Sequence, residues 1–278
     1  MLFMEPKMPR YYVDVHCHLT DPRYQDDLEQ VLANCRQAGL ARIVINGLNP
    51  ATNRQILQLQ QQHPDLVRAA LGIYPLYVRP DRLRVDLPHI ETFDLDAEIQ
   101  FIREQAEQGH LAAVGECGLD GHYLSAEELP DQERVLLELG HIAKAHDLPL
   151  IVHSRKFERR AFEVLQELEH DKIIMHCYSG KSKWALQALE KQKFSFSIPA
   201  NAPKHQGFQK LLRSLPLECI LTETDSPYLS PIPGTRNSPE NVVGVVKLLA
   251  EYRELSIESA KQQIWQNYQS LFAEDSQV

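Results

Sequence analysis

Residues 11–18 read Tyr-Tyr-Val-Asp-Val-His-Cys-His, an apolar run that ends in two histidines one residue apart. In a β-strand alternate side chains project from the same face, so His16 and His18 are expected to point together. Four more residues of metal-binding kinds close or follow apolar runs later in the chain, namely Glu116, His153, His176 and Asp225. Polar side chains at the same end of several parallel strands predict a barrel that binds metal at one rim.

Eight short apolar runs, rich in β-branched residues, recur along the chain and are separated by helical patterns. The runs are 12–16, 42–46, 67–72, 112–116, 150–153, 173–176, 194–198 and 220–224, with helical patterns such as 26–38, 95–109, 131–146, 157–170 and 183–193 between them. A last helix is expected from near Ser256. Regular alternation of strand and helix predicts an α/β fold, a (β/α)8 TIM barrel, as one domain over 11–272 with short tails at 1–10 and 273–278.

Composition supports one globular domain. The chain has 278 residues, 43% of them hydrophobic, enough for the core of a single barrel. Its five cysteines form no C-x-x-C pair, and residues 1–10 contain Glu5 and two prolines, which suits neither a signal peptide nor a membrane anchor. We therefore expect a cytoplasmic protein with no membrane contact and no obligate protein partner.

The charge distribution is uneven. The formal net charge is −9, yet residues 153–213 hold 12 Lys/Arg against six Asp/Glu. A basic segment beside bound cations could attract a phosphate group. Ordinary solvated helix faces explain the same excess equally well.

Six candidate ligands are too many for one tetrahedral ion but suit two divalent ions about 3.5–4 Å apart, bridged by a carboxylate. The expected ligands are His16, His18, Glu116, His153, His176 and Asp225, with Glu116 as the bridge. Imidazole and carboxylate donors suit Zn²⁺, Mn²⁺ or a similar ion, whereas Mg²⁺ prefers more oxygen. Asp225 is also the expected catalytic base, because a carboxylate that binds one metal can accept a proton from water.

Three further residues share a strand face with these ligands. Arg155 lies two residues after His153, and its guanidinium suits a phosphate, with a surface ion pair as the alternative. Glu223 and Asp14 precede Asp225 and His16 by two residues. A hydrogen bond to a ligating histidine would explain a buried carboxylate at either position, and a structural ion pair is nearly as good an explanation.

Tyr178 is a candidate for substrate binding, for two reasons. Residues 178–180 follow the sixth strand run and are predicted to begin a helix, whose N–H groups could receive an anion. An ordinary N-cap by Ser179 or Ser182 is equally plausible. Tyrosines near the predicted rim loops could also stack on nucleic-acid bases, although packing is their commoner role; they are Tyr74, Tyr77, Tyr123 and Tyr178.

The chain resembles the TatD family of metal-dependent hydrolases. The matching stretches are residues 14–19, 115–120, 152–155, 175–180, 222–229, 236–237 and 267–272. The resemblance implies a TIM barrel, two divalent metals and hydrolysis of phosphodiesters, with members that look like 3′–5′ exonucleases on DNA, RNA being an alternative substrate.

Two positions depart from the family pattern. The family usually carries His-Pro-His after the third strand, whereas residues 73–76 read Ile-Tyr-Pro-Leu, so a phosphate contact there would pass to the Tyr74 hydroxyl or be lost. Lys156 replaces the acidic residue that usually follows His-Ser-Arg. Neither departure changes an expected ligand, so they bear on the substrate rather than on hydrolysis.

Two other functions compete with a phosphodiester hydrolase. Barrels with His-x-His on the first strand also resemble amidohydrolases and phosphotriesterases, which hydrolyse small amides, lactones or esters and often bridge their metals with a modified lysine. Glu116 in that place favours the TatD-like group. The second alternative is a metal-binding barrel without enzymatic activity, which the complete set of candidate ligands disfavours.

Overall fold

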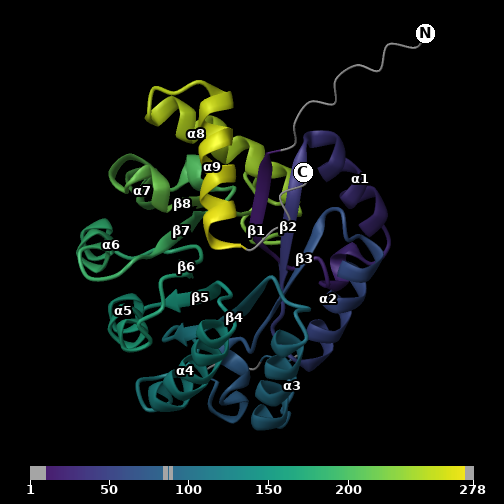
Figure 1. The fold of residues 1–278 in the computed structure, drawn as a ribbon, viewed down its shortest axis with the longest axis vertical. Coiled ribbons are helices and arrows are strands. Elements are labelled where there is room, and N and C mark those ends of the chain that lie inside the picture. The colour runs from purple at the N-terminus through teal and green to yellow at the C-terminus, as the bar shows by residue number, and fades with distance from the viewer. Residues whose placement is uncertain (1–10, 84–86, 88–89, 273–278) are drawn as a thin grey trace.

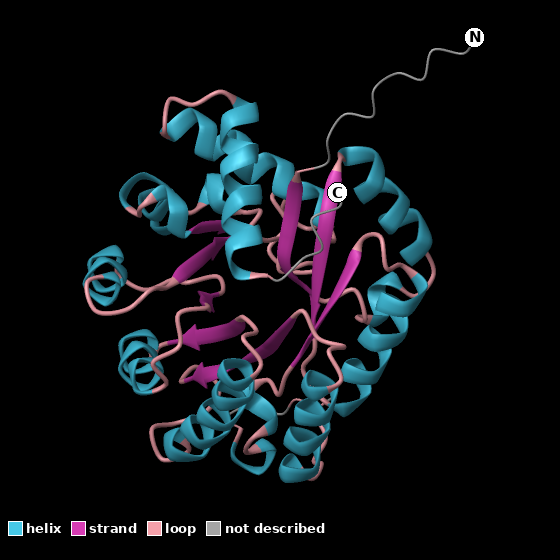
Figure 2. Ribbon diagram, in the orientation of Figure 1, coloured by secondary structure: helices cyan, strands magenta, loops and turns pink. Residues whose placement is uncertain are grey.

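The computed structural model describes residues 11–83, Leu87 and 90–272, so the predicted tails at 1–10 and 273–278 lie outside the described residues. Eight parallel strands form one sheet in chain order, and a ring of helices surrounds them (Figure 2). The strands are β1 (Tyr12–Cys17), β2 (Leu40–Asn46), β3 (Val67–Leu71), β4 (Ala113–Asp120), β5 (Leu150–Arg155), β6 (Ile173–Met175), β7 (Ser195–Ile198) and β8 (Ile220–Thr222). The predicted TIM barrel is confirmed.

Helices alternate with the strands and lie outside them (Figure 1). They are α1 (Leu28–Ala38), α2 (Pro50–Gln62), α3 (Leu95–Glu107), α4 (Leu129–Ala145), α5 (Glu158–Glu167), α6 (Ser182–Leu189), α7 (Gln206–Ser214), α8 (Val242–Tyr252) and α9 (Ile257–Leu271). The last helix begins where the sequence predicts, because the Ser256 hydroxyl accepts a hydrogen bond from the Ser259 amide at 3.0 Å. None of these helices is long and apolar enough to cross a membrane.

The barrel closes between its first and last strands through residues at and beyond the end of β8. The Thr222 hydroxyl donates to the Val13 carbonyl at 2.6 Å, and the Asp225 amide donates to the His16 carbonyl at 2.9 Å. One residue further, Ser226 pairs with Cys17 as an isolated parallel bridge. Closure therefore brings Asp225 beside the histidines of β1.

Two strands run further than the sequence indicates. The apolar runs predict ends at residues 116 and 153, but β4 continues to Asp120 and β5 to Arg155. Backbone pairing continues to the Asp120–Arg155 rung, since ladder hydrogen bonds do not require apolar side chains. Glu116 and His153 consequently lie inside their strands rather than at the ends.

Candidate metal centre

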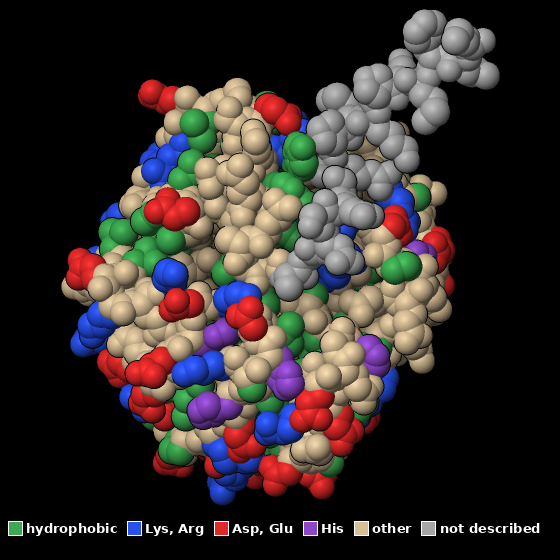
Figure 3. Space-filling model, viewed as in Figure 1, with side chains coloured by type: hydrophobic (Ala, Val, Ile, Leu, Met, Phe, Trp, Pro, Cys, Tyr) green, Lys and Arg blue, Asp and Glu red, His purple; other side chains and the backbone are tan. Residues whose placement is uncertain are grey.

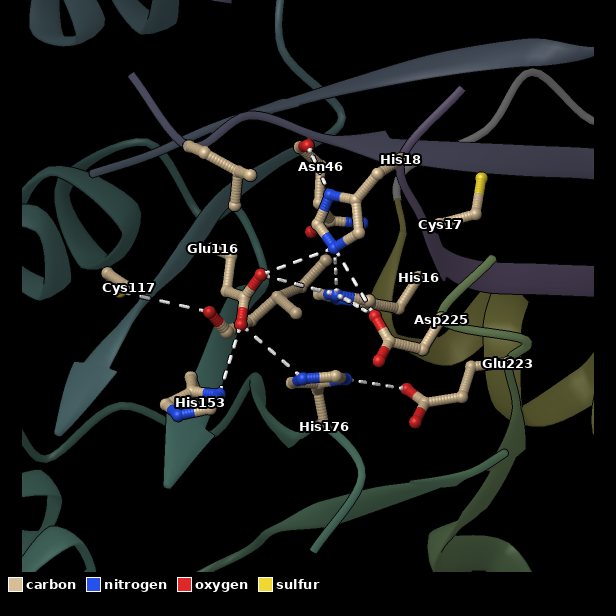
Figure 4. Close-up of polar contacts among 12 residues, drawn as sticks. His16, Cys17, His18, Asn46, Glu116, Cys117, His153, His176, Glu223 and Asp225 are labelled. Atoms are coloured by element: carbon tan, nitrogen blue, oxygen red, sulfur yellow. Dashed lines mark hydrogen bonds and ion pairs between the residues drawn. The ribbon is translucent and has the colours of Figure 1, made fainter. Parts of the chain in front are cut away.

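The structure brings the six predicted ligands together at the end of the barrel where the strands finish (Figure 4). They come from β1 and its end (His16, His18), β4 (Glu116), β5 (His153) and the segments just after β6 (His176) and β8 (Asp225). Side chains more than 200 residues apart in sequence thus face one another. The Nε2 atoms of His16 and His18 are 3.1 Å apart, and each lies within 3.5 Å of Asp225 Oδ1.

Glu116 lies between two groups of histidines. Its Oε2 atom is 3.4 Å from His16 Nε2 and 3.5 Å from His18 Nε2. Its Oε1 atom is 3.2 Å from His153 Nδ1 and 3.4 Å from His176 Nε2. The two oxygens of one carboxylate therefore face different pairs of imidazoles.

Close backbone approach positions this carboxylate. Gly118 in β4 has a φ of +144°, and a Cβ atom there would lie 2.0 Å from the His153 carbonyl oxygen. Glycine is therefore required for β4 and β5 to approach closely at this level. Asp225 has a left-handed φ of 54°, and its backbone N–H donates a hydrogen bond to the His16 carbonyl oxygen. These local conformations bring carboxylates and imidazoles into one cluster.

The cluster keeps its carboxylates ionised although they are buried. Burial alone would raise the pKa of Glu116, but electrostatic interaction with the His16 and His176 imidazoles lowers it well below its usual range. Burial also opposes ionisation of Asp225, and hydrogen bonds from His16 and His18 lower its pKa. Burial lowers the pKa of His176, while the charges of Glu223 and Glu116 outweigh that effect and raise it well above the ordinary value.

Three of the four histidines have an acceptor for their second ring nitrogen. His18 Nδ1 lies 3.1 Å from the Asn46 carbonyl oxygen. His176 Nδ1 lies 3.1 Å from Glu223 Oε2, and His153 Nε2 lies 3.0 Å from Asp120 Oδ2. A nitrogen that donates to such an acceptor leaves the other nitrogen with a lone pair for a metal. In each case that other nitrogen faces Glu116.

His16 is different. Its Nδ1 atom is buried and has no hydrogen-bond partner among the described residues. Its ring instead stacks on His176, with centroids 3.6 Å apart and planes 13° apart. Stacking between rings from β1 and the segment after β6 fixes the orientation of the His16 ring without a polar acceptor.

Asp14 does not bind the His16 ring, so the expected hydrogen bond to that imidazole is wrong. Its Oδ1 atom accepts from the backbone amides of His16 at 3.1 Å and Thr224 at 3.0 Å. Its Oδ2 atom accepts from the Thr224 hydroxyl. Because Thr224 offers two donors across the closed barrel, the carboxylate ties β1 to the segment that carries Asp225.

Asp120 and Asn46 contact candidate ligands but are absent from the predicted site. Asp120 follows Glu116 by four residues in β4, and the alternation of a strand would place both on one face. The apolar run predicts a strand that ends at residue 116, so the predicted alternation does not extend to Asp120. Asn46 acts through its backbone carbonyl, which no side-chain pattern reveals.

Arg155 and Tyr74 lie at the rim beside His153. The Arg155 residue is exposed, its guanidinium carbon lies 5.6 Å from the centroid of the Tyr123 ring, and it makes no ion pair with any described residue. The Tyr74 ring meets the His153 ring edge to face at 5.0 Å. Burial, followed by the charge of Glu116, raises the pKa of Tyr74 well above its ordinary value, so its hydroxyl keeps its proton at neutral pH.

Tyr178 is part of the core, so the predictions of a stacking ring and of a helix start at this residue are wrong. The ring is buried against Phe162 and Phe196, and the hydroxyl donates to the Lys181 carbonyl at 3.2 Å. Helix α6 begins only at Ser182, with Lys181 at the N-cap position and no side-chain cap. The left-handed φ of 44° at Cys177 ends the strand alternation and turns Tyr178 towards α5.

The basic excess in residues 153–213 is partly engaged in surface ion pairs. The pairs are Arg160 with Glu133 (2.6 Å), Lys172 with Asp147 (2.7 Å), Lys193 with Asp171 (3.5 Å) and Arg159 with Glu163 (3.6 Å). Figure 3 shows acidic and basic side chains interspersed on one face of the molecule. The solvated-face interpretation therefore accounts for these four cations, whereas Arg155 makes no such pair with a described residue and lies on β5, the strand of His153.

The donor set fits a divalent first-row metal. Ligand atoms lie within 4.8 Å of one another in three groups: His16, His18 and Glu116; Glu116, His153 and His176; and His16, His176 and Asp225. These groups combine imidazole nitrogens with carboxylate oxygens, the donors that Zn²⁺ and Mn²⁺ prefer.

Comparison with known proteins supports this chemistry. The family model described as "TatD related DNase" matches residues 13–273. Human "Deoxyribonuclease TATDN3" is 32% identical over 263 residues, which cover 94% of each chain. A Mycoplasma pneumoniae protein described as an uncharacterized metal-dependent hydrolase is 32% identical over 272 residues, 94% of this chain and 99% of that one.

A solved structure gives the same fold. The TatD homologue YJJV from Escherichia coli superposes with a TM-score of 0.83 at 25% identity, over 96% of this chain and 100% of that one. A lactonase from Listeria monocytogenes, at 12% identity and a TM-score of 0.66, shows the fold alone. The family match covers both the barrel and all six clustered residues, and the chain therefore belongs to the TatD related DNase family and is a metal-dependent hydrolase.

Proposed function

We propose that this hydrolase is a deoxyribonuclease that removes nucleotides from single-stranded DNA in the 3′–5′ direction, using two divalent metal ions. The observation that carries the two-ion arrangement is the Glu116 carboxylate, whose oxygens face different pairs of histidines. The name of the human relative supports DNA as the substrate. A panel of substrates tests the direction of degradation and its dependence on metal.

The chain offers one group of ligands for each ion. His16, His18 and Asp225 with Glu116 Oε2 would hold the first ion, and His153 and His176 with Glu116 Oε1 would hold the second. Such ions lower the pKa of water towards neutrality and take up negative charge from a phosphate in the transition state.

Asp225 is the proposed general base. Its side chain is 18% exposed, whereas that of Glu116 is 3% exposed, so Asp225 is the carboxylate of this pair that solvent reaches. Its lowered pKa keeps it ionised at neutral pH. Asp225 can therefore accept the proton of an attacking water from the edge of the site.

Arg155 and Tyr74 are the proposed phosphate contacts. The guanidinium of Arg155 has donors free of carboxylate partners in the described part of the chain and stands at the same rim as His153. A planar guanidinium can bind two phosphate oxygens at once. The protonated hydroxyl of Tyr74, whose ring meets the His153 ring edge to face, would donate a further hydrogen bond.

A panel of substrates tests this function. The purified protein is dialysed against EDTA and then assayed with Mn²⁺, Mg²⁺ or Zn²⁺ on single-stranded DNA, RNA, a lactone and an amide. We expect hydrolysis of the DNA to be lost on chelation and restored by a metal. With a 5′ label a 3′–5′ exonuclease gives a descending ladder, and with a 3′ label it releases a labelled mononucleotide at once.

Other outcomes would contradict specific parts of the proposal. Activity that survives thorough chelation would exclude the two-ion scheme. Cleavage confined to the lactone or the amide would favour an amidohydrolase-like enzyme. A labelled mononucleotide released first from the 5′ end would reverse the direction.

A further inference from the structure

Tyr228 is an exposed aromatic residue at the edge of the metal centre. The residue is 49% exposed and lies in the loop that follows β8. The Tyr228 amide donates to the Asp225 carbonyl at 2.9 Å, which fixes the loop three residues after the proposed base. Its ring centroid lies 6.4 Å from that of His18. An aromatic surface is therefore held next to the group of ligands proposed for the first ion.

Arg23 supports one side of this ring. Its guanidinium carbon lies 4.4 Å from the centroid of the Tyr228 ring. The same guanidinium is fixed by Asp21 through two hydrogen bonds of 2.8 Å, from Nε to Oδ1 and from Nη2 to Oδ2. Because Asp21 balances its charge, Arg23 is a weaker phosphate ligand than Arg155 but a rigid planar support for an aromatic ring.

The other large apolar side chains do not offer the same surface. Four large hydrophobic residues are strongly exposed in the described part of the chain, and Tyr228 is the aromatic one among Leu186, Tyr228, Ile232 and Ile257. On the opposite side of the centre, beside His153, lie Arg155 and Tyr74. The two sides therefore differ chemically. The His153 side carries a guanidinium that has no ion pair with a described residue, and the His18 side carries a half-exposed ring over which an ion-paired guanidinium lies.

We propose that Tyr228, backed by Arg23, stacks against the nucleobase of a nucleotide adjoining the scissile phosphate. This inference rests on the proposed nuclease function and assigns the base to the His18 side and the phosphate contact to the His153 side. Every base has an aromatic face, so stacking there binds single strands with little preference for sequence. In a closed duplex the bases are already stacked on one another and cannot reach the Tyr228 ring. The pair of Tyr228 and Arg23 therefore selects single-stranded ends.

A comparison of two single-stranded oligonucleotides tests the stacking directly. One is a single-stranded oligothymidylate, and the other has abasic tetrahydrofuran residues in place of the last three nucleotides at each end. Tyr228→Leu keeps an apolar side chain but removes the ring, and Tyr228→Phe keeps the ring. We expect Tyr228→Leu to raise KM about tenfold on the intact strand and to change it less than twofold on the abasic strand. Tyr228→Phe should stay within about twofold of the wild type on both.

A second arginine–tyrosine pair provides the matched control. Arg213 lies over the Tyr252 ring at 3.8 Å, at the C-terminal end of α8. Helices of such a barrel run opposite to the strands, so this pair is at the far end from the metal centre. Tyr252→Leu should therefore leave KM unchanged on both oligonucleotides.

Two results would overturn the inference, and they are distinguishable. An equal rise in KM on intact and abasic strands, or no rise on either, would refute stacking while the nuclease function stands. Failure of the metal-restored wild-type protein to degrade the intact strand would refute the nuclease function and this inference with it.

Discussion

Asp120 Oδ2 lies 3.0 Å from His153 Nε2, and the opposite ring nitrogen of His153 lies 3.2 Å from Glu116 Oε1. Asp120 is itself held rigidly, because its Oδ1 atom accepts from the backbone amides of His122 at 2.7 Å and Tyr123 at 3.0 Å. The carboxylate therefore fixes both the orientation of the His153 ring and the nitrogen that carries the proton.

Asp120→Asn should weaken metal binding at the His153 side. The two backbone donors would retain the amide oxygen of the new side chain, so its NH2 group would face His153 Nε2 and favour the proton on Nδ1. We expect the affinity for one of two ions to fall about 10- to 100-fold, measured by calorimetric titration of the metal-free protein with Mn²⁺. Asp131→Asn, which removes an ion pair with Arg79 at the surface, is the control. Unchanged affinity for both ions would show that Asp120 has no such role.

Asp225→Asn should abolish most turnover while leaving the fold intact. The amide keeps the shape of the side chain but cannot accept a proton from water at neutral pH, and general-base catalysis contributes about 10²- to 10⁴-fold. Both the lost base and the weakened ligand lower kcat, measured on single-stranded DNA with saturating metal. Circular dichroism checks the fold, and Asp171→Asn on the surface is the control. Full turnover by Asp225→Asn would refute its role.

Arg155→Ala should raise KM for DNA with a smaller effect on kcat. A charge-assisted bond to phosphate contributes about 1.5–3 kcal/mol, so we expect KM to rise about tenfold or more, with partial recovery in Arg155→Lys. Arg159→Ala removes an exposed arginine that pairs with Glu163 on α5, and it should have little effect. Steady-state kinetics at constant ionic strength measure KM for each variant. An equal KM for Arg155→Ala and Arg159→Ala would contradict a specific contact between Arg155 and phosphate.

The barrel and its six clustered residues follow from local patterns in the sequence. Apolar runs mark the strands, and several of these runs end at or just before a polar residue of a metal-binding kind, as Glu116 and His176 illustrate. Parallel strands in a closed sheet must bring such residues to one rim, so no long-range information is needed to expect their meeting.

The contacts of other polar residues depend on register and closure, which local patterns do not contain. Asp14 binds Thr224 rather than a histidine because the barrel closes between β1 and β8. Asp120 reaches His153 because β4 and β5 stay paired beyond their apolar residues. Tyr178 enters the core because the chain turns at Cys177, where a left-handed φ interrupts the alternation of the strand.

His170 should make the stability of the protein depend on pH, independently of the metal centre. His170 is 5% exposed, its Nε2 atom donates to the Leu148 carbonyl at 2.8 Å, and burial lowers its pKa. The unfolded chain, with an ordinary pKa of about 6.5, therefore takes up a proton first as the pH falls. The free energy of unfolding should decrease as the pH drops through that value and level off below the folded-state pKa.

Urea unfolding of the chelated protein at pH 7.5 and 5.5 measures this loss of unfolding free energy, which should be smaller in His170→Gln than in the wild type. His141→Gln, on the exposed face of α4, should lose as much as the wild type, and an equal loss in His170→Gln would contradict the assignment.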